Sequence, residues 1–274
     1  MKTDIKALEE KAKYIRQQIL SMCCRAGTGH VNSSFSCTEI MVALYHGGIM
    51  RVEPGNPGWA GRDRFILSKG QASVILYPVL ADLGFFPEEE LDRFNAVDGK
   101  FGVHLQHDVP GVEITSGSLG HGLGVATGIA LAAKMNRDSF LTFALLGDGE
   151  CYEGSIWESA MFASHYRLNN LVAIVDRNHL CVTDFTENIV ALEPFADKWR
   201  AFGWDVEEID GHSFEEIFKA LSGVRAMKSV KPKVVIADTV KGKGVSFLCN
   251  APLWHGIAPS GELAKQAKSE LGME

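Results

Sequence analysis

The chain has 274 residues, of which 46% are apolar, so it can bury the core of one large domain. Its formal net charge is −7 and it contains no run of basic residues, which argues against nucleic acid or an anionic membrane surface as a partner. No apolar stretch reaches roughly 18 residues, and the first residues lack the apolar core of a signal peptide. We therefore expect neither a membrane span nor a secretory leader.

Hydrophobic periodicity divides the chain into alternating helices and strands. In the first half it predicts, in chain order, a helix over 5–24, a helix over about 36–46, a strand over 64–67, and helices over 73–84, 87–95 and 123–135. In the second half it predicts a strand over 140–146, a helix around 156–166, a strand over 171–175, a helix near 193–202, a strand over 205–210, a helix over 213–227, a strand over 233–240 and a helix over 260–271. This alternation indicates an α/β fold with a mostly parallel sheet flanked by helices on both faces, which we interpret as one domain over residues 1–274.

The six cysteines of the chain include no Cys-x-x-Cys pair. Cys23 and Cys24 are adjacent, which does not suggest a disulfide framework. Reduced thiols are typical of a cytoplasmic protein, and we expect that location here.

Two polar side chains follow consecutive apolar strands in the middle of the chain. Asp148 stands in a Gly-Asp-Gly turn after the strand over 140–146, and Asn178 follows the strand over 171–175. The helix between them makes the strands parallel, and ligands bind outside the carboxyl ends of parallel strands. One carboxylate and one amide oxygen there suit a cation such as Mg²⁺, and Gly149 would let the backbone approach a diphosphate. Taken singly, each residue is also typical of an ordinary turn or cap.

Glycine-bearing loops carry the other candidate residues. His30 and His255 lie in such loops, and His104 lies in the long irregular stretch over 96–118, a kind of segment that is usually functional in a compact domain. The glycine-rich start of the helix over 123–135 presents free N–H groups and the positive end of a helix dipole, which suit a phosphate. A lone loop histidine is more often an ordinary surface residue, so each of these is a hypothesis.

Four motifs, met in this order along the chain, resemble those of the transketolase family. They are Arg-Asp-Arg-Phe-Ile-Leu-Ser-Lys-Gly over 62–70, Thr-Ser-Gly-Ser-Leu-Gly-His-Gly over 115–122, Gly-Asp-Gly-Glu-Cys-Tyr-Glu-Gly over 147–154 and Lys-Gly-Lys-Gly-Val-Ser-Phe over 241–247. The Gly-Asp-Gly turn with Asn about thirty residues later also resembles the thiamine-diphosphate motif. From about residue 10 to about residue 260 the chain is similar to the N-terminal half of split transketolases, in which two chains replace one. The resemblance implies the diphosphate-binding (PP-domain) fold.

The resemblance also implies cofactors and a role for each matching residue. The cofactors would be thiamine diphosphate and Mg²⁺, with Ca²⁺ or Mn²⁺ as replacements for the latter. The metal ligands would be Asp148, Asn178 and the main-chain carbonyl of Leu180. The catalytic residues would be His30, His104 and His255. The cofactor contacts would come from Gln71, Gly117, Ser118, Leu119, Gly149, Glu153, Asn178 and His255.

Three positions are less regular than the rest of the match. Gln71 stands where full-length transketolases usually carry His, and it keeps a hydrogen-bond donor but cannot titrate. The loop after His104 is one residue shorter than the usual family loop. Glu153 is similar to a family residue near the subunit interface, and a helix N-terminal acid stabilised by the dipole is its ordinary alternative.

The implied activity needs a second chain. The family's pyrimidine-binding domain is expected on an obligate partner, the C-terminal transketolase subunit, in an α2β2 assembly. Together the two chains would transfer a two-carbon ketol unit from a ketose phosphate to an aldose. The alternatives are the α subunit of a 2-oxoacid dehydrogenase, an enzyme similar to 1-deoxyxylulose-phosphate synthase, and a non-catalytic cofactor-binding subunit. The sugars stay open, from pentose phosphates to apulose phosphate or sulfosugars.

Overall fold

The structure is a computed structural model that describes residues 4–273. Its α-helices are α1 (Ile5–Ala26), α2 (Val31–Phe35), α3 (Thr38–Tyr45), α4 (Ser73–Asp82), α5 (Gly122–Asn136), α6 (Gly154–His165), α7 (Thr186–Ile189), α8 (Phe195–Ala201), α9 (Phe214–Leu221) and α10 (Gly261–Glu270). Its strands are β1 (Arg64–Leu67), β2 (Thr142–Gly147), β3 (Leu171–Arg177), β4 (Leu180–Cys181), β5 (Asp184–Phe185), β6 (Asp205–Asp210) and β7 (Lys233–Asp238). No helix within the described range is both long and apolar enough to cross a bilayer. The expectation about a leader falls partly on residues 1–3, which lie outside that range.

Five parallel strands form the main sheet, in the order β1-β2-β3-β7-β6. The two central strands β2 and β3 are buried along their whole length, because helices cover both faces of a parallel sheet. In their register, Thr142 is opposite Leu171 and Gly147 is opposite Asp176. The carboxyl ends of β2 and β3 therefore reach the same edge of the sheet side by side.

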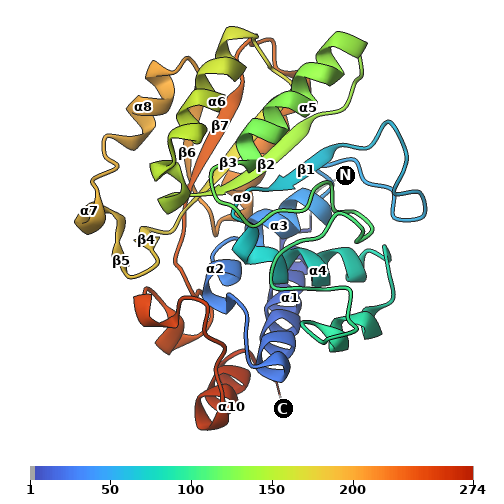
Figure 1. Cartoon of the computed structure of the whole chain (residues 1–274), viewed down its shortest axis with the longest axis vertical. Coiled ribbons are helices and arrows are strands. Elements are labelled where there is room, and N and C mark those ends of the chain that lie inside the picture. The colour runs from blue at the N-terminus through green and yellow to red at the C-terminus, as the bar shows by residue number, and fades with distance from the viewer. Residues whose placement is uncertain (1–3, 274) are drawn as a thin grey trace.

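Two hydrophobic layers lie on the two faces of this sheet (Figure 1). Phe143 and Leu145 of β2 point into the layer formed with α1, α3, α4 and α9. Ala144 and Leu146 point into the opposite layer, formed with α5, α6 and α8. This alternation follows from the strand geometry, in which successive side chains point to opposite faces. The predicted fold class, a mostly parallel sheet with helices on both faces, is confirmed.

Several predicted element boundaries were wrong. The segment predicted as a helix over 87–95 is a 3-10 helix, Glu88–Arg93, in which only Leu91 is buried, so little apolar surface stabilises a longer helix. The helix predicted over 213–227 ends at Leu221, because Ser222 and Gly223 are poor helix formers. The stretch after Asn178, predicted as irregular to about residue 190, contains the β4–β5 hairpin and α7.

Two glycines of α5 should respond in opposite directions to replacement by alanine. A Cβ at Gly122 would lie 2.6 Å from Cα of Ser68, at the end of β1, whereas a Cβ at Gly128 would meet nothing within 4 Å. We expect Gly122→Ala to lower the free energy of unfolding by about 1–3 kcal/mol, because the helix must move from the sheet. Gly128→Ala should raise it by about 0.5–1 kcal/mol, since alanine is the better helix former. Urea denaturation measures both, and a loss of stability in both variants would contradict the packing described here.

Candidate functional site

The loops that follow β2 and β3 meet at the carboxyl edge of the sheet. The main-chain N–H of His179 donates to Oδ2 of Asp148 at 2.6 Å, so the two loops are joined directly. Asp148 and Asn178 are 1% and 5% exposed, and both line one cavity of about 150 Å³. The structure therefore brings together the two side chains that the sequence placed at consecutive strand ends.

Most of the predicted site residues line this cavity. They are Gln71, Gly117, Leu119, Asp148, Gly149, Asn178, Leu180 and His255. Four others are not in its wall: His30, His104, Ser118 and Glu153. The wall also contains residues for which no role was predicted, namely Ser33, Lys69, Gly147, Glu150, Cys181, Val182 and Lys241. Lys69 and Lys241 belong to two of the four quoted motifs, and those motifs were the signal that could have identified them.

The carboxylate of Asp148 accepts three hydrogen bonds from the protein itself. Its Oδ1 accepts from the N–H of Gly149 at 2.8 Å, and its Oδ2 accepts from His179 and from Nη1 of Arg177, the latter at 3.2 Å. Burial, and then the charge of Asp176, raise the pKa of Asp148, with Arg177 opposing them. A divalent cation against this carboxylate would relieve both effects, because it favours the charged form.

Gly149 is required by the packing of the protein itself. A Cβ at this position would lie 2.8 Å from both Cβ and Sγ of Cys181, which stands directly after Leu180. The backbone of the Gly-Asp-Gly turn thus approaches the loop after β3 closely. This contact keeps the two halves of the cavity wall together, whatever the cavity holds.

Glu153 stands at the N-terminus of α6, as its ordinary alternative requires, whereas Glu150 is buried in the cavity wall. Glu153 is the exposed N-cap residue of α6 and its side chain makes no capping hydrogen bond. Glu150 is instead 2% exposed and accepts from the N–H groups of Gly120 at 2.9 Å and Gly147 at 3.0 Å. It therefore ties the loop before α5 to the end of β2.

A buried ion pair has one member, Lys69, in the cavity wall. The ammonium of Lys69, 1% exposed, contacts Oδ2 of Asp176, 0% exposed. Burial opposes both charges, but the pair outweighs it: the pKa of Lys69 is raised and that of Asp176 is lowered. Each charge is thus stabilised mainly by the other.

Removing one member of this pair should be costly. We expect Lys69→Met to lower the free energy of unfolding by about 3–5 kcal/mol, because Asp176 would stay buried without its counter-ion. Arg200 offers a matched control, since its pairs with Asp197 and Glu208 are on the surface, and Arg200→Met should change the free energy of unfolding little. Chemical denaturation of the two variants should separate them clearly, and equal small losses would refute the importance of the buried pair.

Of the three predicted histidines, His255 lines the cavity, and His30 and His104 contact residues of its wall. The rings of His30 and His255 lie edge to face with centroids 5.0 Å apart, and Nζ of Lys241 lies 3.3 Å from Nδ1 of His255. The ring of His104 packs on Gly117, where a Cβ would come within 3.2 Å of it. Burial is the main cause that lowers the pKa of His30 and of His255 to about 4, and nearby positive groups add to it. Both imidazoles are therefore neutral at pH 7.

The lowered pKa values of His30 and His255 should reduce the stability of the protein below pH 7. In the unfolded chain the same histidines titrate near pH 6.5, so between about pH 6.5 and 4 the unfolded state binds more protons than the folded state. We expect the free energy of unfolding to fall as the pH is lowered through this window. Urea titrations at several pH values measure it, and the slope should be smaller for His30→Gln. NMR signals showing a protonated His30 at pH 6 would contradict this prediction.

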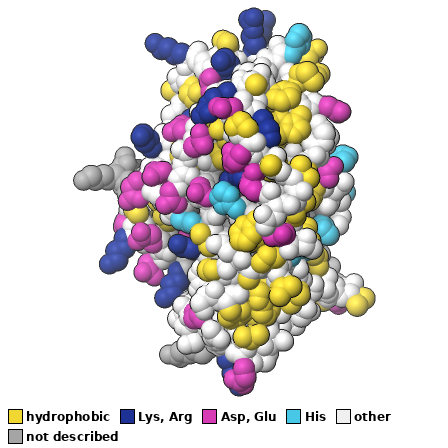
Figure 2. All heavy atoms as spheres, turned by 90° about the vertical axis from the view of Figure 1, so that its left-hand side faces the viewer, with side chains coloured by type: hydrophobic (Ala, Val, Ile, Leu, Met, Phe, Trp, Pro, Cys, Tyr) yellow, Lys and Arg dark blue, Asp and Glu magenta, His cyan; other side chains and the backbone are white. Residues whose placement is uncertain are grey.

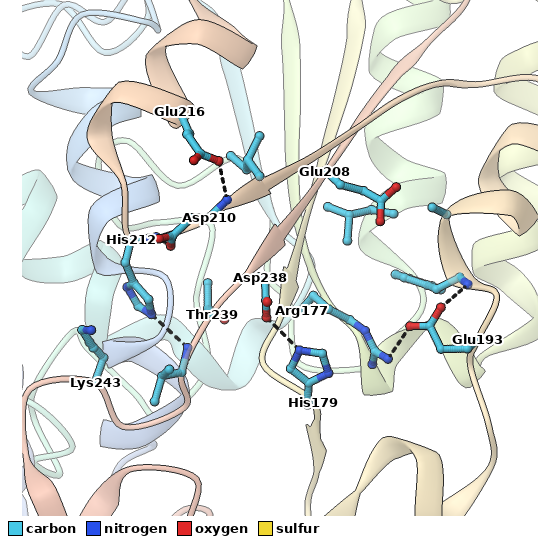
Figure 3. Close-up of a pocket in the computed structure, with 15 residues that line it drawn as sticks. Arg177, His179, Glu193, Glu208, Asp210, His212, Glu216, Asp238, Thr239 and Lys243 are labelled. Carbon is cyan, nitrogen blue, oxygen red and sulfur yellow. Dashed lines mark hydrogen bonds and ion pairs between the residues drawn. The ribbon is translucent and has the colours of Figure 1, made fainter.

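A larger hollow of about 690 Å³ opens nearby, at the ends of β3, β7 and β6 (Figure 3). Several of its polar groups are engaged with one another: His179 with Asp238 at 2.7 Å, Glu216 with the N–H of Asp210 at 2.8 Å, His212 with the N–H of Val240 at 2.9 Å, and Arg177 with Glu193 at 3.0 Å. None of the residues predicted for the site lines it. The smaller cavity is therefore the candidate site.

The candidate cavity offers oxygen ligands of mixed kinds. Within residues 4–273 no group of three or more His, Cys, Asp or Glu side chains is arranged to hold a metal ion. Asp148, the Asn178 amide and a main-chain carbonyl form a set with a single carboxylate, which suits a Mg²⁺ ion that also binds phosphate oxygens. Gln71 adds an unpartnered polar atom: within the described chain its Oε1 is buried without a hydrogen bond. These residues fit a cation and the diphosphate group that it would carry.

The fold and the cavity together define a cofactor-binding α/β domain whose site lies at the carboxyl edge of a parallel sheet. The chain belongs to the transketolase family: residues 8–274 match the family model described as transketolase, thiamine diphosphate binding domain. The resemblance read from the motifs is thus confirmed, and the chain is a transketolase subunit that uses thiamine diphosphate. A 2-oxoacid dehydrogenase subunit is not favoured.

Two of the similar proteins are named as enzyme subunits. The chain is 39% identical to a subunit of the apulose-4-phosphate transketolase of Phocaeicola vulgatus, over 97% of this chain and 94% of that protein. It is 41% identical to 6-deoxy-6-sulfo-D-fructose transketolase subunit SqwG of a Clostridium species, over 97% of each. It is 37% identical to transketolase of Homo sapiens, of which it covers 42%. The crystal structure of Campylobacter jejuni transketolase is similar with a TM-score of 0.93 and 32% identity, over 99% of this chain and 43% of that one.

Proposed function

We propose that this chain supplies the metal- and diphosphate-binding half of a two-subunit transketolase. The observation that carries the proposal is the convergence of Asp148, Asn178 and Leu180 on one cavity wall, with the two strand-end loops joined by the bond from His179 to Asp148. We propose that residues 1–274 act as one cofactor-binding domain. The cytoplasmic location expected from the sequence remains a proposal.

Different residues of the cavity would bind the metal ion and the diphosphate. The Asp148 carboxylate, the Asn178 amide oxygen and the Leu180 carbonyl would hold Mg²⁺, and Ca²⁺ or Mn²⁺ could replace it. The ammonium of Lys241, 2% exposed and in the cavity wall, would offset the negative charge of a diphosphate. Gly117, Ser118 and Leu119, all predicted as cofactor contacts, would contact it through the main chain. Bound thiamine diphosphate supplies the electron sink for the transferred two-carbon unit.

The histidines would handle the sugar. His30 and His255 are neutral near pH 7, so each ring can donate one hydrogen bond and accept another. We propose that they position the hydroxyl groups of the donor sugar and move protons to and from its oxygens, with His104 on the same channel. Nδ1 of His30 is buried and has no hydrogen-bond partner within residues 4–273.

We further propose that a second subunit completes the enzyme, in an α2β2 assembly. Two relatives named as subunits are matched along 94% and 97% of their length, whereas the enzyme of Homo sapiens is matched along 42%. Figure 2 shows hydrophobic side chains gathered on the face that carries the β4–β5 hairpin, α7 and the segment before α10. The large apolar side chains exposed on these elements are Val182, Phe185, Ile189, Val190, Leu253 and Ile257. An exposed apolar patch beside a cofactor cavity supports an interface there.

The names of the relatives indicate which class of donor sugar to expect. One relative is named for apulose-4-phosphate and another for 6-deoxy-6-sulfo-D-fructose, so a ketose with an anionic end group is the donor class that we propose. Pentose phosphates belong to the same class. Gln71 lies in the cavity wall and is a candidate for the residue that sets this choice.

Calorimetry tests the proposal at the level of binding. Thiamine diphosphate should bind the chain when Mg²⁺ is present. Its affinity should fall sharply when EDTA removes the metal. Adding back Mg²⁺, Mn²⁺ or Ca²⁺ should restore binding, because each accepts oxygen ligands. Cofactor binding that is indifferent to EDTA would contradict the proposed site, and thiamine without its diphosphate serves as the control ligand.

A further inference from the structure

The amide of Asn178 has a second partner beyond the cavity. We propose that Asp176 is a positioning residue, whose carboxylate fixes the Asn178 side chain so that its amide oxygen is the end available to a cation. This inference rests on the proposed function, since it takes Asn178 as a ligand of the metal.

Two hydrogen bonds determine the orientation of the Asn178 amide. Its Nδ2 donates to Oδ2 of Asp176 at 3.1 Å, and its Oδ1 accepts from the N–H of Leu180 at 3.2 Å. A carboxylate only accepts, so the amide must turn its NH₂ group toward Asp176. A main-chain N–H only donates, so the amide must turn its oxygen toward Leu180. Both contacts select the same orientation, and the oxygen keeps a second lone pair for a cation.

Asp176 can impose this orientation because it cannot rotate. It is 0% exposed, and its Oδ2 also accepts from Oγ of Ser36 at 2.6 Å and pairs with Lys69. Its Oδ1 accepts from the hydroxyl of Thr239. These partners come from three other segments: the end of α2, the loop after β1 and the loop after β7. A carboxylate held from several directions keeps a fixed position, and the Asn178 amide that bonds to it in the cavity wall is fixed with it.

The neighbouring strand provides a matched control. Asp238 ends β7 and is opposite Arg177 in the register, so it stands beside Asp176 at the same edge of the sheet. Its side chain is 72% exposed and pairs with His179, which is also partly exposed. Asp238→Asn thus makes the same chemical change nearby without touching Asn178.

A double-mutant cycle tests the inference. Calorimetry would give the Kd for thiamine diphosphate at saturating Mg²⁺ for the wild-type chain, Asp176→Asn, Asn178→Ala, the double variant and Asp238→Asn. We expect Asp176→Asn to raise Kd by about 10–100-fold, as is usual for residues that orient metal ligands. In the Asn178→Ala background the same change should add less than about threefold, because the residue through which Asp176 acts is gone. Asp238→Asn should stay within about twofold of wild type.

The outcomes are distinct. If the wild-type chain shows no Mg²⁺-dependent binding, the proposed function fails before the inference is reached. If the wild type binds but the effects of the two substitutions simply multiply, Asp176 acts independently of Asn178 and the inference is overturned. Thermal unfolding checks each variant. Should Asp176→Asn not fold, Thr239→Val replaces it in the cycle, because it frees Oδ1 while keeping the ion pair, and multiplicative effects there overturn the inference equally.

Discussion

Asp148→Ala should abolish Mg²⁺-dependent binding of thiamine diphosphate, with Kd raised by more than about 100-fold. Substituting a residue that merely orients a metal ligand costs roughly 10–100-fold, so loss of a direct ligand should exceed that range. The cavity wall has a second carboxylate, Glu150, but it already accepts hydrogen bonds from Ser68, Gly120 and Gly147. It therefore cannot replace the missing ligand. Calorimetric titration at fixed Mg²⁺ measures the effect.

Asp148→Asn separates the ligand role from loop structure. The N–H groups of Gly149 and His179 bond to different oxygens of the wild-type carboxylate, whereas an amide has one acceptor oxygen. With that oxygen toward His179, the amide keeps the bond between the loops and gives up the bond from Gly149. The loops should therefore stay joined while the charge that attracts the cation is lost. We expect the free energy of unfolding to fall by about 1–3 kcal/mol, because one N–H loses its acceptor, and cofactor binding to weaken by at least about tenfold. Full cofactor affinity in both variants would rule out Asp148 as a metal ligand.

The second large effect should be an all-or-none dependence on the other subunit. With donor ketose, aldose acceptor, Mg²⁺ and thiamine diphosphate, the isolated chain should show no ketol transfer above background. Adding the second subunit should restore turnover, because the chain covers 42% of the Homo sapiens enzyme and matches along its own length the relatives named as subunits. A coupled assay for the aldose product measures this, and turnover by the isolated chain would refute the two-subunit proposal.

The same experiment addresses the non-catalytic alternative. Tight Mg²⁺-dependent cofactor binding without transfer, even when the cognate second subunit is present, would favour a regulatory or storage role. Variants at the exposed apolar side chains provide a further control for assembly. Phe185→Ser, on the surface of the β4–β5 hairpin, should weaken association of the subunits without changing the stability of the chain, because the side chain is 41% exposed.

The sheet and the two strand-end ligands could be predicted because their signals are local. The apolar runs over β2 and β3 are unbroken, and each ends in a polar residue, so alternation and parallel pairing followed directly. Long helices with a clear apolar face, such as α1, could also be predicted from the sequence. The 3-10 helix Glu88–Arg93 was not, because a sequence rich in acids after a proline favours a helix start without fixing its length.

The polar support of the site could not be predicted, because it joins segments far apart in the chain. Asp176 contacts Ser36, Lys69 and Thr239, which are separated from it by 140, 107 and 63 positions. No local pattern distinguishes such a residue from an ordinary strand-end acid. Glu150 was missed for the same reason, since its partners Ser68 and Gly120 become neighbours only in the folded sheet.

The hydrogen bond from the His179 main chain to Asp148 should also affect the rate of ligand binding and the size of the accompanying loop movement. With the carboxylate already fixed by two N–H groups, little torsional freedom is left to lose when the ion arrives. The loaded and empty forms of these loops should then superpose closely, and loading should proceed without a slow isomerisation.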